Sequence, residues 1–417
     1  MQEKQLTFDP RHHQLTNSQI WTPDSQWLVF DTRPPEATFN SLTVERVNVN
    51  NGQNEILYRA SQGACVGVIS CSPGLPERYV CIHGPENPDK FWHYDFHHRR
   101  GVIIEDGRAI TLDACDITPP YTPGALRGGT HVHMFDSEGE FLSFTYNDHV
   151  MHERSLAEDM RNVGVAVPLH PVIVCGQHPR EYNGSHFCVL VSQTTVNPQP
   201  GSDQINRAYE EGWVGNAGYR KASGEWQRRA LVFIGDTLSS EGRKVPEIFI
   251  VDLPEHPEDF TTDGVFPLQG LTDRLPFPPQ GVVQRRLTHT RGIALQPRHW
   301  LRTSPDGSII TFLMADENGI IQLWSISPEG GTPEQITCLP DSIASVVNWH
   351  PQDDVVAFVC DNSIMACDIR SGLCRRLTPR TEQAPCADAV VWSPDGLKIA
   401  YMRDISGWRQ LFMVTDF

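Results

Sequence analysis

Histidines that could share a metal ion are the most suggestive chemistry in this 417-residue sequence, and the clearest pair is His131-Val-His133. Residues i and i+2 of a β-strand point to the same side, so both imidazoles could reach one ion. Together with His186 and His299 they would form a site for a divalent metal, Mn or Zn, with positions left open for a substrate. The competing interpretation is that all four are hydrogen-bonded or solvated residues on a polar rim.

The elements that must position these histidines repeat along the chain. Residues 300–337 contain short apolar runs separated by Ser-Pro-Asp-Gly, Glu-Asn-Gly and Pro-Glu-Gly-Gly, in which proline and glycine adopt the backbone angles of tight turns. Related stretches begin at Trp349 and Trp392, 49 and 43 residues further along in turn, and near the start at Trp21. Sheets of roughly 40 residues that need neighbours to bury both faces are typical of propeller blades. The sequence therefore predicts an all-β fold, a seven-bladed β-propeller of four-stranded antiparallel blades.

The last repeat stops after three strands, at residue 417. The pattern Gln/Arg-Leu-Thr, which ends earlier repeats, occurs as Gln5-Leu6-Thr7 near the N-terminus. We predict that the N-terminal strand joins the last blade and closes the ring, because closure removes the open sheet edges. Residues 1–417 then form a single propeller with two insertions, one at 148–162 with helical spacing and one at 193–230.

Apolar runs assign the strands in the middle of the chain. We assign residues 91–96 to the third strand of blade two, 172–174 to the outermost strand of blade three, and 186–191 to the innermost strand of blade four. Innermost strands line the central channel, so their first residues form the rim of a funnel. On this assignment His131, His133, His186 and His299 all lie at that rim.

Composition excludes several classes of function. The net charge is −17 and no Lys/Arg run exceeds two residues, which argues against nucleic-acid binding. No apolar run approaches the roughly 20 residues of a membrane span, and no Gly-rich phosphate loop indicates a nucleotide cofactor. The N-terminus lacks the apolar core of a signal peptide, and the odd number of cysteines, 11, is typical of free thiols. We expect a cytoplasmic monomer.

The repeat, with an aromatic residue before Ser-Pro-Asp-Gly and a later Gln/Arg-Leu-Thr, resembles that of Tol-type (TolB-like, WD40-like) propellers. Over its whole length the chain also resembles the YidR-type family of uncharacterised enterobacterial proteins, through stretches such as Trp92–Arg100 and Tyr146–His152. This second resemblance implies a family and a fold but no activity.

The placement of the histidines is similar to that in oligogalacturonate lyases, seven-bladed propellers that hold Mn²⁺ with three His and one Gln. Gln177 is the candidate for the Gln. This resemblance implies β-elimination on a uronide, an anionic sugar, in which a metal stabilises the charge that develops on the carboxylate and a base removes the adjacent proton. The candidate catalytic residues, chosen by their position in nearby loops, are Arg127, Arg180, Arg298 and His149.

Two classes of function stay open. The first is a metal-dependent carbohydrate-active enzyme with inward-pointing His and Arg side chains. The second is a non-catalytic scaffold that binds a protein partner on the same face, as Tol-type propellers do, and that exposes apolar and aromatic residues there. The stretch Trp92–Arg100 alternates aromatic and polar residues, which fits packing between blades or a surface for sugar or protein contact.

Overall fold

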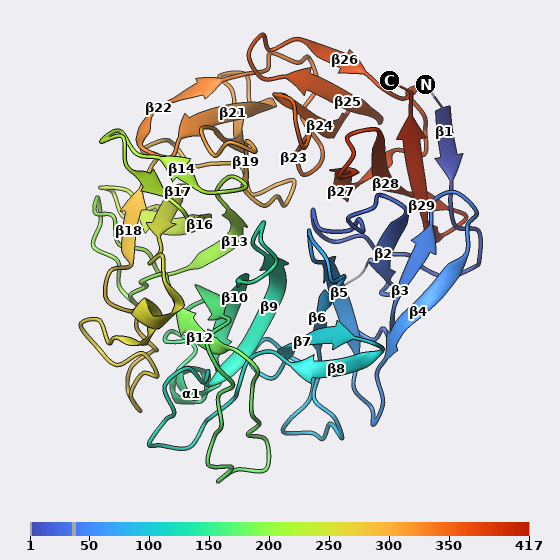
Figure 1. Cartoon of the computed structure of the whole chain (residues 1–417). Coiled ribbons are helices and arrows are strands. Elements are labelled where there is room, and N and C mark those ends of the chain that lie inside the picture. The colour runs from blue at the N-terminus through green and yellow to red at the C-terminus, as the bar shows by residue number, and fades with distance from the viewer. Residues whose placement is uncertain (1, 36–38, 417) are drawn as a thin grey trace.

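The computed structural model describes residues 2–35 and 39–416, which form seven antiparallel sheets arranged in a ring (Figure 1). Each sheet is one blade, and its strands follow one another from the axis of the ring to the rim. The seven-bladed propeller predicted from the repeats is confirmed. Within the described ranges no helix is long and apolar enough to cross a membrane.

The first four blades occupy residues 14–286. Blade one contains β2 (Trp27–Asp31), β3 (Thr43–Asn48) and β4 (Asn54–Arg59), and residues 14–21 add single bridges on the inner side. Blade two contains β5 (Val66–Cys71), β6 (Tyr79–His83), β7 (Arg100–Glu105) and β8 (Arg108–Thr111). Blade three contains β9 (Gly128–Phe135), β10 (Leu142–Asp148), β11 (Asn162–Val167) and β12 (Phe187–Leu190). Blade four contains β13 (Ala208–Trp213), β16 (Ala230–Leu238), β17 (Lys244–Asp252) and β18 (Val283–Arg286).

The last three blades complete the ring. Blade five contains β19 (Arg302–Thr303), β20 (Ile310–Ala315), β21 (Ile321–Ser327) and β22 (Gly330–Gln335). Blade six contains β23 (Asn348–Trp349), β24 (Val355–Cys360), β25 (Ser363–Asp368) and β26 (Cys374–Arg376). Blade seven contains β27 (Pro385–Trp392), β28 (Lys398–Ile405), β29 (Trp408–Thr415) and, from the other end of the chain, β1 (Gln2–Gln5).

β1 closes the ring as the outermost strand of blade seven (Figure 1). Its residues pair antiparallel with β29, from Gln2 opposite Thr415 to Gln5 opposite Phe412. The buried Leu6 then packs into the core between blades seven and one. Pairing of strands from the two ends of the chain agrees with the predicted closure.

The Gln-Leu-Thr sequence at the N-terminus makes the same hydrogen bonds as Gln335-Ile336-Thr337 of blade five. The hydroxyl of Thr7 donates to Gln410 Oε1 at 2.7 Å and accepts from the next backbone N–H of β29 at 2.9 Å. The hydroxyl of Thr337 donates to Gln322 Oε1 at 2.7 Å and accepts from the next backbone N–H of β21 at 2.9 Å. The N-terminal segment therefore has the role of the last strand in a regular blade.

The Ser-Pro-Asp-Gly turn of blade five is held by its own side chains. Ser304 Oγ donates to Asp306 Oδ1 at 2.6 Å, and Asp306 Oδ1 also accepts the backbone N–H of Ser308 at 3.0 Å. Gly307 has a φ of 73°, a conformation that side chains disfavour. The turn between β19 and β20 thus follows directly from four consecutive residues.

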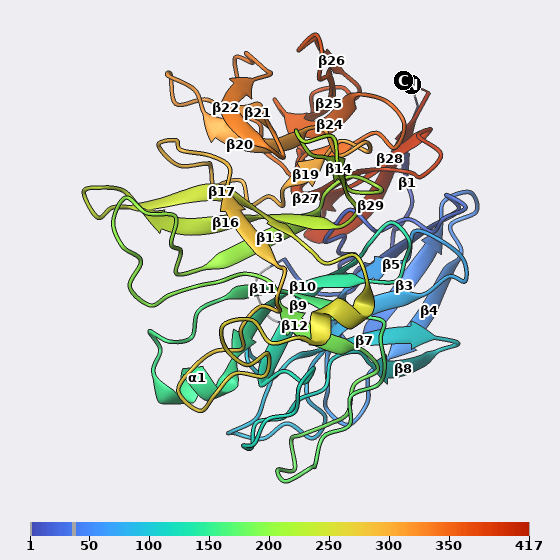
Figure 2. The same ribbon diagram turned by 60° about the vertical axis from the view of Figure 1, so that its left-hand side comes forward.

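The assignment of outer and inner strands differs from the prediction in blades three and four. Residues 187–190 form β12, the outermost strand of blade three, and the innermost strand of blade four is β13, inside the segment 193–230. The hairpin of β14 (Tyr219–Arg220) and β15 (Trp226–Gln227) follows it. β12 has the sequence of an inner strand because Phe187 and Val189 are covered by Phe260 and Leu268, from the segment around the 3-10 helix η1 (Pro257–Thr261), which lies beside β12 (Figure 2).

Two other predicted strands are loops. Residues 91–96 belong to the connection between β6 and β7, and Val172 makes only a single bridge, to Gly184. The helical segment expected within 148–162 is α1 (His149–Arg154), in the connection between β10 and β11. Asp148 caps this helix by accepting the backbone N–H of Met151 at 2.9 Å.

Candidate functional site

The innermost strands of three consecutive blades share one irregularity. β5, β9 and β13 each contain a β-bulge: the inner strand advances by three residues where the next strand advances by two, so the inner strand has one extra residue. The second residue of each bulge has a positive φ: 57° at Val68, 52° at Val132 and 56° at Glu210. A bulge interrupts the alternation of side chains and redirects them, and such backbone conformations concentrate at functional sites.

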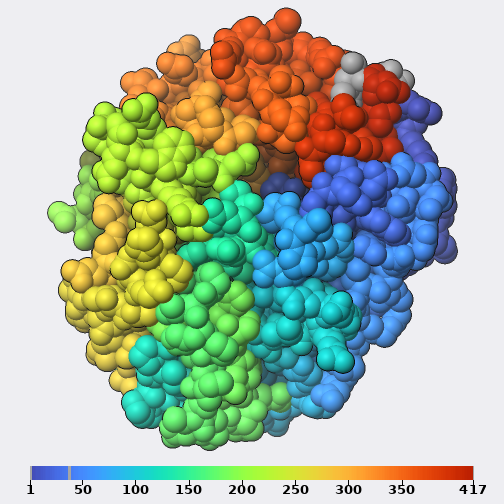
Figure 3. All heavy atoms as spheres, viewed as in Figure 1, coloured from blue at the N-terminus to red at the C-terminus, as the bar shows by residue number. Residues whose placement is uncertain are grey.

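An apolar cluster fills the axis of the ring. Val68, Val132, Trp300 and Val346 pack together, and they come from blades two, three, five and six. Side chains from opposite parts of the ring can meet only near its axis. The central channel therefore contains apolar side chains, and the space-filling view shows a hollow near the centre (Figure 3).

The bulge separates His131 from His133. His133 is completely buried, and its Nε2 lies 2.9 Å from Thr130 Oγ1. His131 stays partly exposed, and its Nδ1 has no hydrogen-bond partner in the described part of the chain. The rule that residues i and i+2 share a side holds for a regular strand, and Val132 interrupts this one.

His186 and His299 do not lie on β9, the strand that carries His131 and His133. His186 precedes the outermost strand of blade three, with its Nδ1 2.9 Å from Ser185 Oγ. His299 is buried with its Nδ1 3.1 Å from the carbonyl oxygen of Pro297, and burial lowers its pKa to about 4. Across residues 2–35 and 39–416, no group of three clustered His, Cys, Asp or Glu ligands includes any of the four predicted histidines. A metal site shared by these four histidines stays a prediction.

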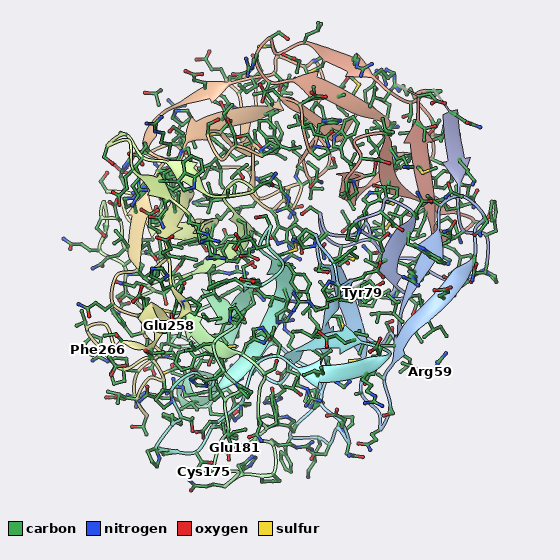
Figure 4. All side chains as sticks on the ribbon, in the orientation of Figure 1. Arg59, Tyr79, Cys175, Glu181, Glu258 and Phe266 are labelled. Atoms are coloured by element: carbon green, nitrogen blue, oxygen red, sulfur yellow. The ribbon has the colours of Figure 1, made fainter. Side chains whose placement is uncertain are left out.

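Arg127 and Arg180 have partners away from the funnel. Arg127 is fully buried, with its Nη2 2.7 Å from Asp148 Oδ2. Arg180 Nη2 lies 2.7 Å from Asp89 Oδ2, in the loop whose Glu181 lies at the outer edge of the ring (Figure 4). Gln177, in the same loop, is exposed. These residues stabilise connections between strands.

His149, on α1, lies beside a second histidine. Its Nδ1 is 3.1 Å from His98 Nε2, and both rings contact Trp92. Burial and the charge of His98 lower the pKa of His149 to about 4. The neutral imidazole is thus part of an aromatic cluster on the face of the ring that carries α1.

The charges of four arginines act on His131. Burial, followed by the charges of Arg99, Arg161, Arg298 and Arg33 in that order, holds the pKa of His131 well below its usual value of 6.5. The first three arginines come from the β6–β7 connection, the residue before β11 and the segment before β19. We call His131 and these three arginines the funnel cluster. Its imidazole is therefore neutral at physiological pH.

Two of the three arginines have no ion pair among the described residues. Arg99 is buried, and its Nε has no hydrogen-bond partner there. Arg161 donates only to the neutral Asn147, at 3.2 Å, and burial with the charges of Arg99 and Arg207 lowers its pKa to about 9. Arg298 differs, because its Nε lies 2.8 Å from Glu210 Oε1. The cluster therefore carries positive charge suited to an anion.

Glu211 provides an acid on the neighbouring inner strand. It is completely buried, and neither carboxyl oxygen has a hydrogen-bond partner on another described residue. Burial and the charge of Glu210 raise the pKa of Glu211 to about 8, although Arg161 and Arg302 oppose the shift. A neutral base and a protonated acid therefore both lie within the field of Arg161, an arrangement that suits proton transfer at neutral pH.

A cavity of about 440 Å³ adjoins the funnel cluster. Its lining includes Phe96, Asn147, Asp159, Arg161 and Arg207. These residues come from connections at one face of the ring, and Phe96 lies under the guanidinium groups of Arg99 and Arg161, at 5.2 and 5.9 Å. The cavity thus combines arginine side chains and an aromatic ring with the carboxylates of Asp159 and Asp236.

Comparison with known sequences shows the family to which the chain belongs. It is 58% identical over 410 residues to the uncharacterised protein YidR of Escherichia coli (strain K12), with 97% of this chain and 96% of that protein covered. The chain belongs to the YidR family. Residues 65–182 also match the family described as a protein of unknown function, DUF3748. That segment of the YidR fold contains three members of the funnel cluster, Arg99, His131 and Arg161.

Solved structures similar to the chain include two oligogalacturonate lyases. One, in complex with manganese, has a TM-score of 0.55 and 12% identity, and the alignment covers 99% of this chain and 92% of that one. The other, from Vibrio parahaemolyticus, has a TM-score of 0.57 and 11% identity, with 99% and 93% covered. At such identities the likeness establishes a common fold.

The sequence prediction missed Arg99, Arg161 and Glu211. Arg99 is the next-to-last residue of the stretch Trp92–Arg100, whose alternation fits packing between blades or a surface for sugar or protein contact. Glu211 lies in Tyr209-Glu-Glu-Gly-Trp213, where two adjacent carboxylates interrupt an aromatic run. That pair of acids was the available signal, since buried strands rarely carry them.

Proposed function

We propose that this protein is an enzyme of the oligogalacturonate-lyase type, which cleaves a uronide by β-elimination in the funnel. The proposal rests on Arg99 and Arg161, two arginines without ion pairs in the described ranges, beside the neutral His131. Unpaired charge away from water is unfavourable unless an anion binds there. A carboxylate suits the planar guanidinium group.

In the proposed reaction the uronide carboxylate binds to Arg99 and Arg161, with Arg298 nearby. His131 accepts the proton from the carbon next to the carboxylate. The electron pair of that C–H bond forms a double bond to the neighbouring carbon, whose bond to the glycosidic oxygen breaks. Glu211 donates its proton to the leaving oxygen. His131 ends protonated and Glu211 ionised, and proton exchange with solvent restores both.

The arginines would stabilise the negative charge that builds on the carboxylate as the proton leaves. Removal of one such donor typically lowers kcat by about 10²–10³-fold. The shared fold with two lyases supports this reaction class. Arg127, Arg180 and His149 have partners that give them structural roles, and no step is assigned to them or to a metal held by the four predicted histidines.

The test is an assay of the purified protein on di- and trigalacturonate, with the unsaturated product followed by its ultraviolet absorbance and by mass spectrometry. We expect turnover by the wild type and a loss of about 10²–10⁴-fold in kcat for His131→Ala. Arg180→Ala, which removes a peripheral arginine, should leave kcat unchanged. Full activity of His131→Ala, or no turnover of any uronide by the wild type, contradicts the proposal.

A scaffold that binds a protein partner is the second candidate. Phe91 and Leu156 are each 77% exposed and Phe96 is 59% exposed, and all three lie in connections at the face that carries the cavity. Exposed apolar side chains that gather on one face are typical of protein contacts. If this role is correct, Phe91→Ser with Leu156→Ser should abolish binding of a partner that His131→Ala still binds.

A further inference from the structure

We propose that His97, His152 and Asp159 bind a divalent first-row transition-metal ion at the edge of the cavity. None of the three belongs to the funnel cluster. Metal binding there does not require the proposed lyase activity, although a bound ion would adjoin the cavity in which we place the uronide.

The three ligand atoms already lie close together. His97 Nε2 is 2.6 Å from Asp159 Oδ2, and His152 Nδ1 is 3.2 Å from the same oxygen. All three ligand atoms lie within 4.8 Å of one another. Bonds of about 2.0–2.2 Å place ligand atoms roughly 3.0–3.5 Å apart around an ion. The His97–Asp159 pair must open by less than about 1 Å on that geometry.

Surrounding residues orient two of the ligands. Asp95 Oδ1 lies 3.4 Å from His97 Nδ1 and accepts the backbone N–H of His97 at 2.7 Å. Asn147 Nδ2 donates to Asp159 Oδ1 at 2.9 Å. A carboxylate behind a ligating imidazole fixes its tautomer and leaves the other nitrogen for the ion. Here Asp95 engages Nδ1, so Nε2 of His97 faces the other ligands.

The fold brings the ligands from two blades. His97 lies in the β6–β7 connection of blade two, whereas His152 is on α1 and Asp159 follows it in blade three. The rings of His97 and His152 lie 3.8 Å apart between centroids. Asp159 also lines the 440 Å³ cavity together with Arg161, and the His152 side chain is 31% exposed. The remaining coordination positions would thus face solvent and the cavity.

Two imidazoles and one carboxylate define the class of ion. This ligand set suits Zn²⁺, Mn²⁺, Fe²⁺ or Co²⁺, whereas Mg²⁺ and Ca²⁺ prefer oxygen ligands. With three protein ligands the ion keeps open positions, which a carboxylate or water could fill.

Metal binding is measured directly on the full chain, purified without a histidine tag and dialysed against a chelator. Zn²⁺, Mn²⁺ and Mg²⁺ are titrated by calorimetry, and Co²⁺ by its visible absorption. We expect one Zn²⁺, Mn²⁺ or Co²⁺ per chain and no comparable Mg²⁺ binding. Asp159→Asn, which preserves side-chain shape, should weaken binding by at least about 100-fold, and Asp95→Asn by about 10–100-fold.

His131→Ala is the matched control, because it removes a histidine of the funnel cluster and should bind metal like the wild type. Circular dichroism and melting temperature check that each variant is folded. Binding that survives Asp159→Asn and His97→Ala/His152→Ala, or no binding by the wild type, overturns the proposal. Metal binding without turnover of uronides would leave this site standing and overturn only the proposed function.

Discussion

The polar groups of blade five are hydrogen-bonded, whereas several on the inner strands of the two preceding blades, three and four, are not. In blade five, Ser304 and Thr337 bond to partners within their own repeat. On the inner strands of blades three and four, His131 Nδ1 and both carboxyl oxygens of Glu211 have no hydrogen-bond partner on another described residue. Repeated polar pairs stabilise the fold, and departures from the repeat coincide with polar groups that lack hydrogen-bond partners near the ring axis.

The largest expected effect tests whether the N-terminal segment is a full member of the repeat. Deletion of residues 1–9 removes β1 and the buried Leu6 and opens the ring. We expect a loss of roughly 4 kcal/mol or more in the free energy of unfolding, beyond the usual range of a single substitution. Urea denaturation measures it. A truncated chain as stable as the full one would show that closure by β1 is dispensable.

The contrast between funnel and periphery predicts different effects for two arginines. Arg298→Ala removes a charge that acts on His131, and we expect kcat on a uronide to fall by about 10²–10³-fold. Arg180→Ala, which breaks only the contacts with Asp89 and the nearby loop, should leave kcat unchanged. Equal effects of the two substitutions on kcat would show that the arginines at the funnel and at the periphery do not differ in function.

Because of Glu211, we expect the free energy of unfolding to depend on pH in a way that a regular blade would not cause. The folded state holds the proton of this carboxyl up to about pH 8, whereas the unfolded chain releases it near 4.5. As pH rises through this window the unfolded state binds fewer protons than the folded state, so stability falls. Glu211→Gln removes this contribution and should be more stable than the wild type above about pH 8, by up to about 5 kcal/mol.

Thermal melting of the wild type and of Glu211→Gln, between about pH 4.5 and pH 8, measures the difference in stability. Near pH 4.5, where both states hold the proton, the two curves should converge if Gln packs as Glu does. Parallel curves with no convergence would mean that Glu211 is ionised in the folded protein, and its role as an acid would then fail.

The smallest effect tests the equivalence of Gln5-Leu6-Thr7 and Gln335-Ile336-Thr337. Thr7→Val and Thr337→Val each leave one backbone N–H and one glutamine oxygen without the hydroxyl partner. We expect each to lower the free energy of unfolding by about 1–3 kcal/mol, and by similar amounts. Chemical denaturation compares them. A negligible effect at Thr7 alone would show that β1 does not complete blade seven as β22 completes blade five.

Sequence alone determined the architecture of this protein. The Ser-Pro-Asp-Gly turns and the closing Gln-Leu-Thr act through side chains and backbone within a few residues or one neighbouring strand, so their pattern is sufficient to predict blades and closure. The prediction was weakest where a strand is covered by a distant segment. β12 is apolar because Phe260 and Leu268 cover it, which no local pattern reveals.

Tertiary structure alone decided which side chains meet in the funnel. The bulge at Val132 depends on how β9 pairs with β10, and it directs His131 and His133 to different surroundings despite their spacing. Arg99, Arg161 and Arg298 converge from three blades, and Glu211 becomes a neutral acid only because burial and Glu210 disfavour its charge. Proximity across the ring and the loss of water around a charge are properties of the packed chain, and neither is encoded in local spacing.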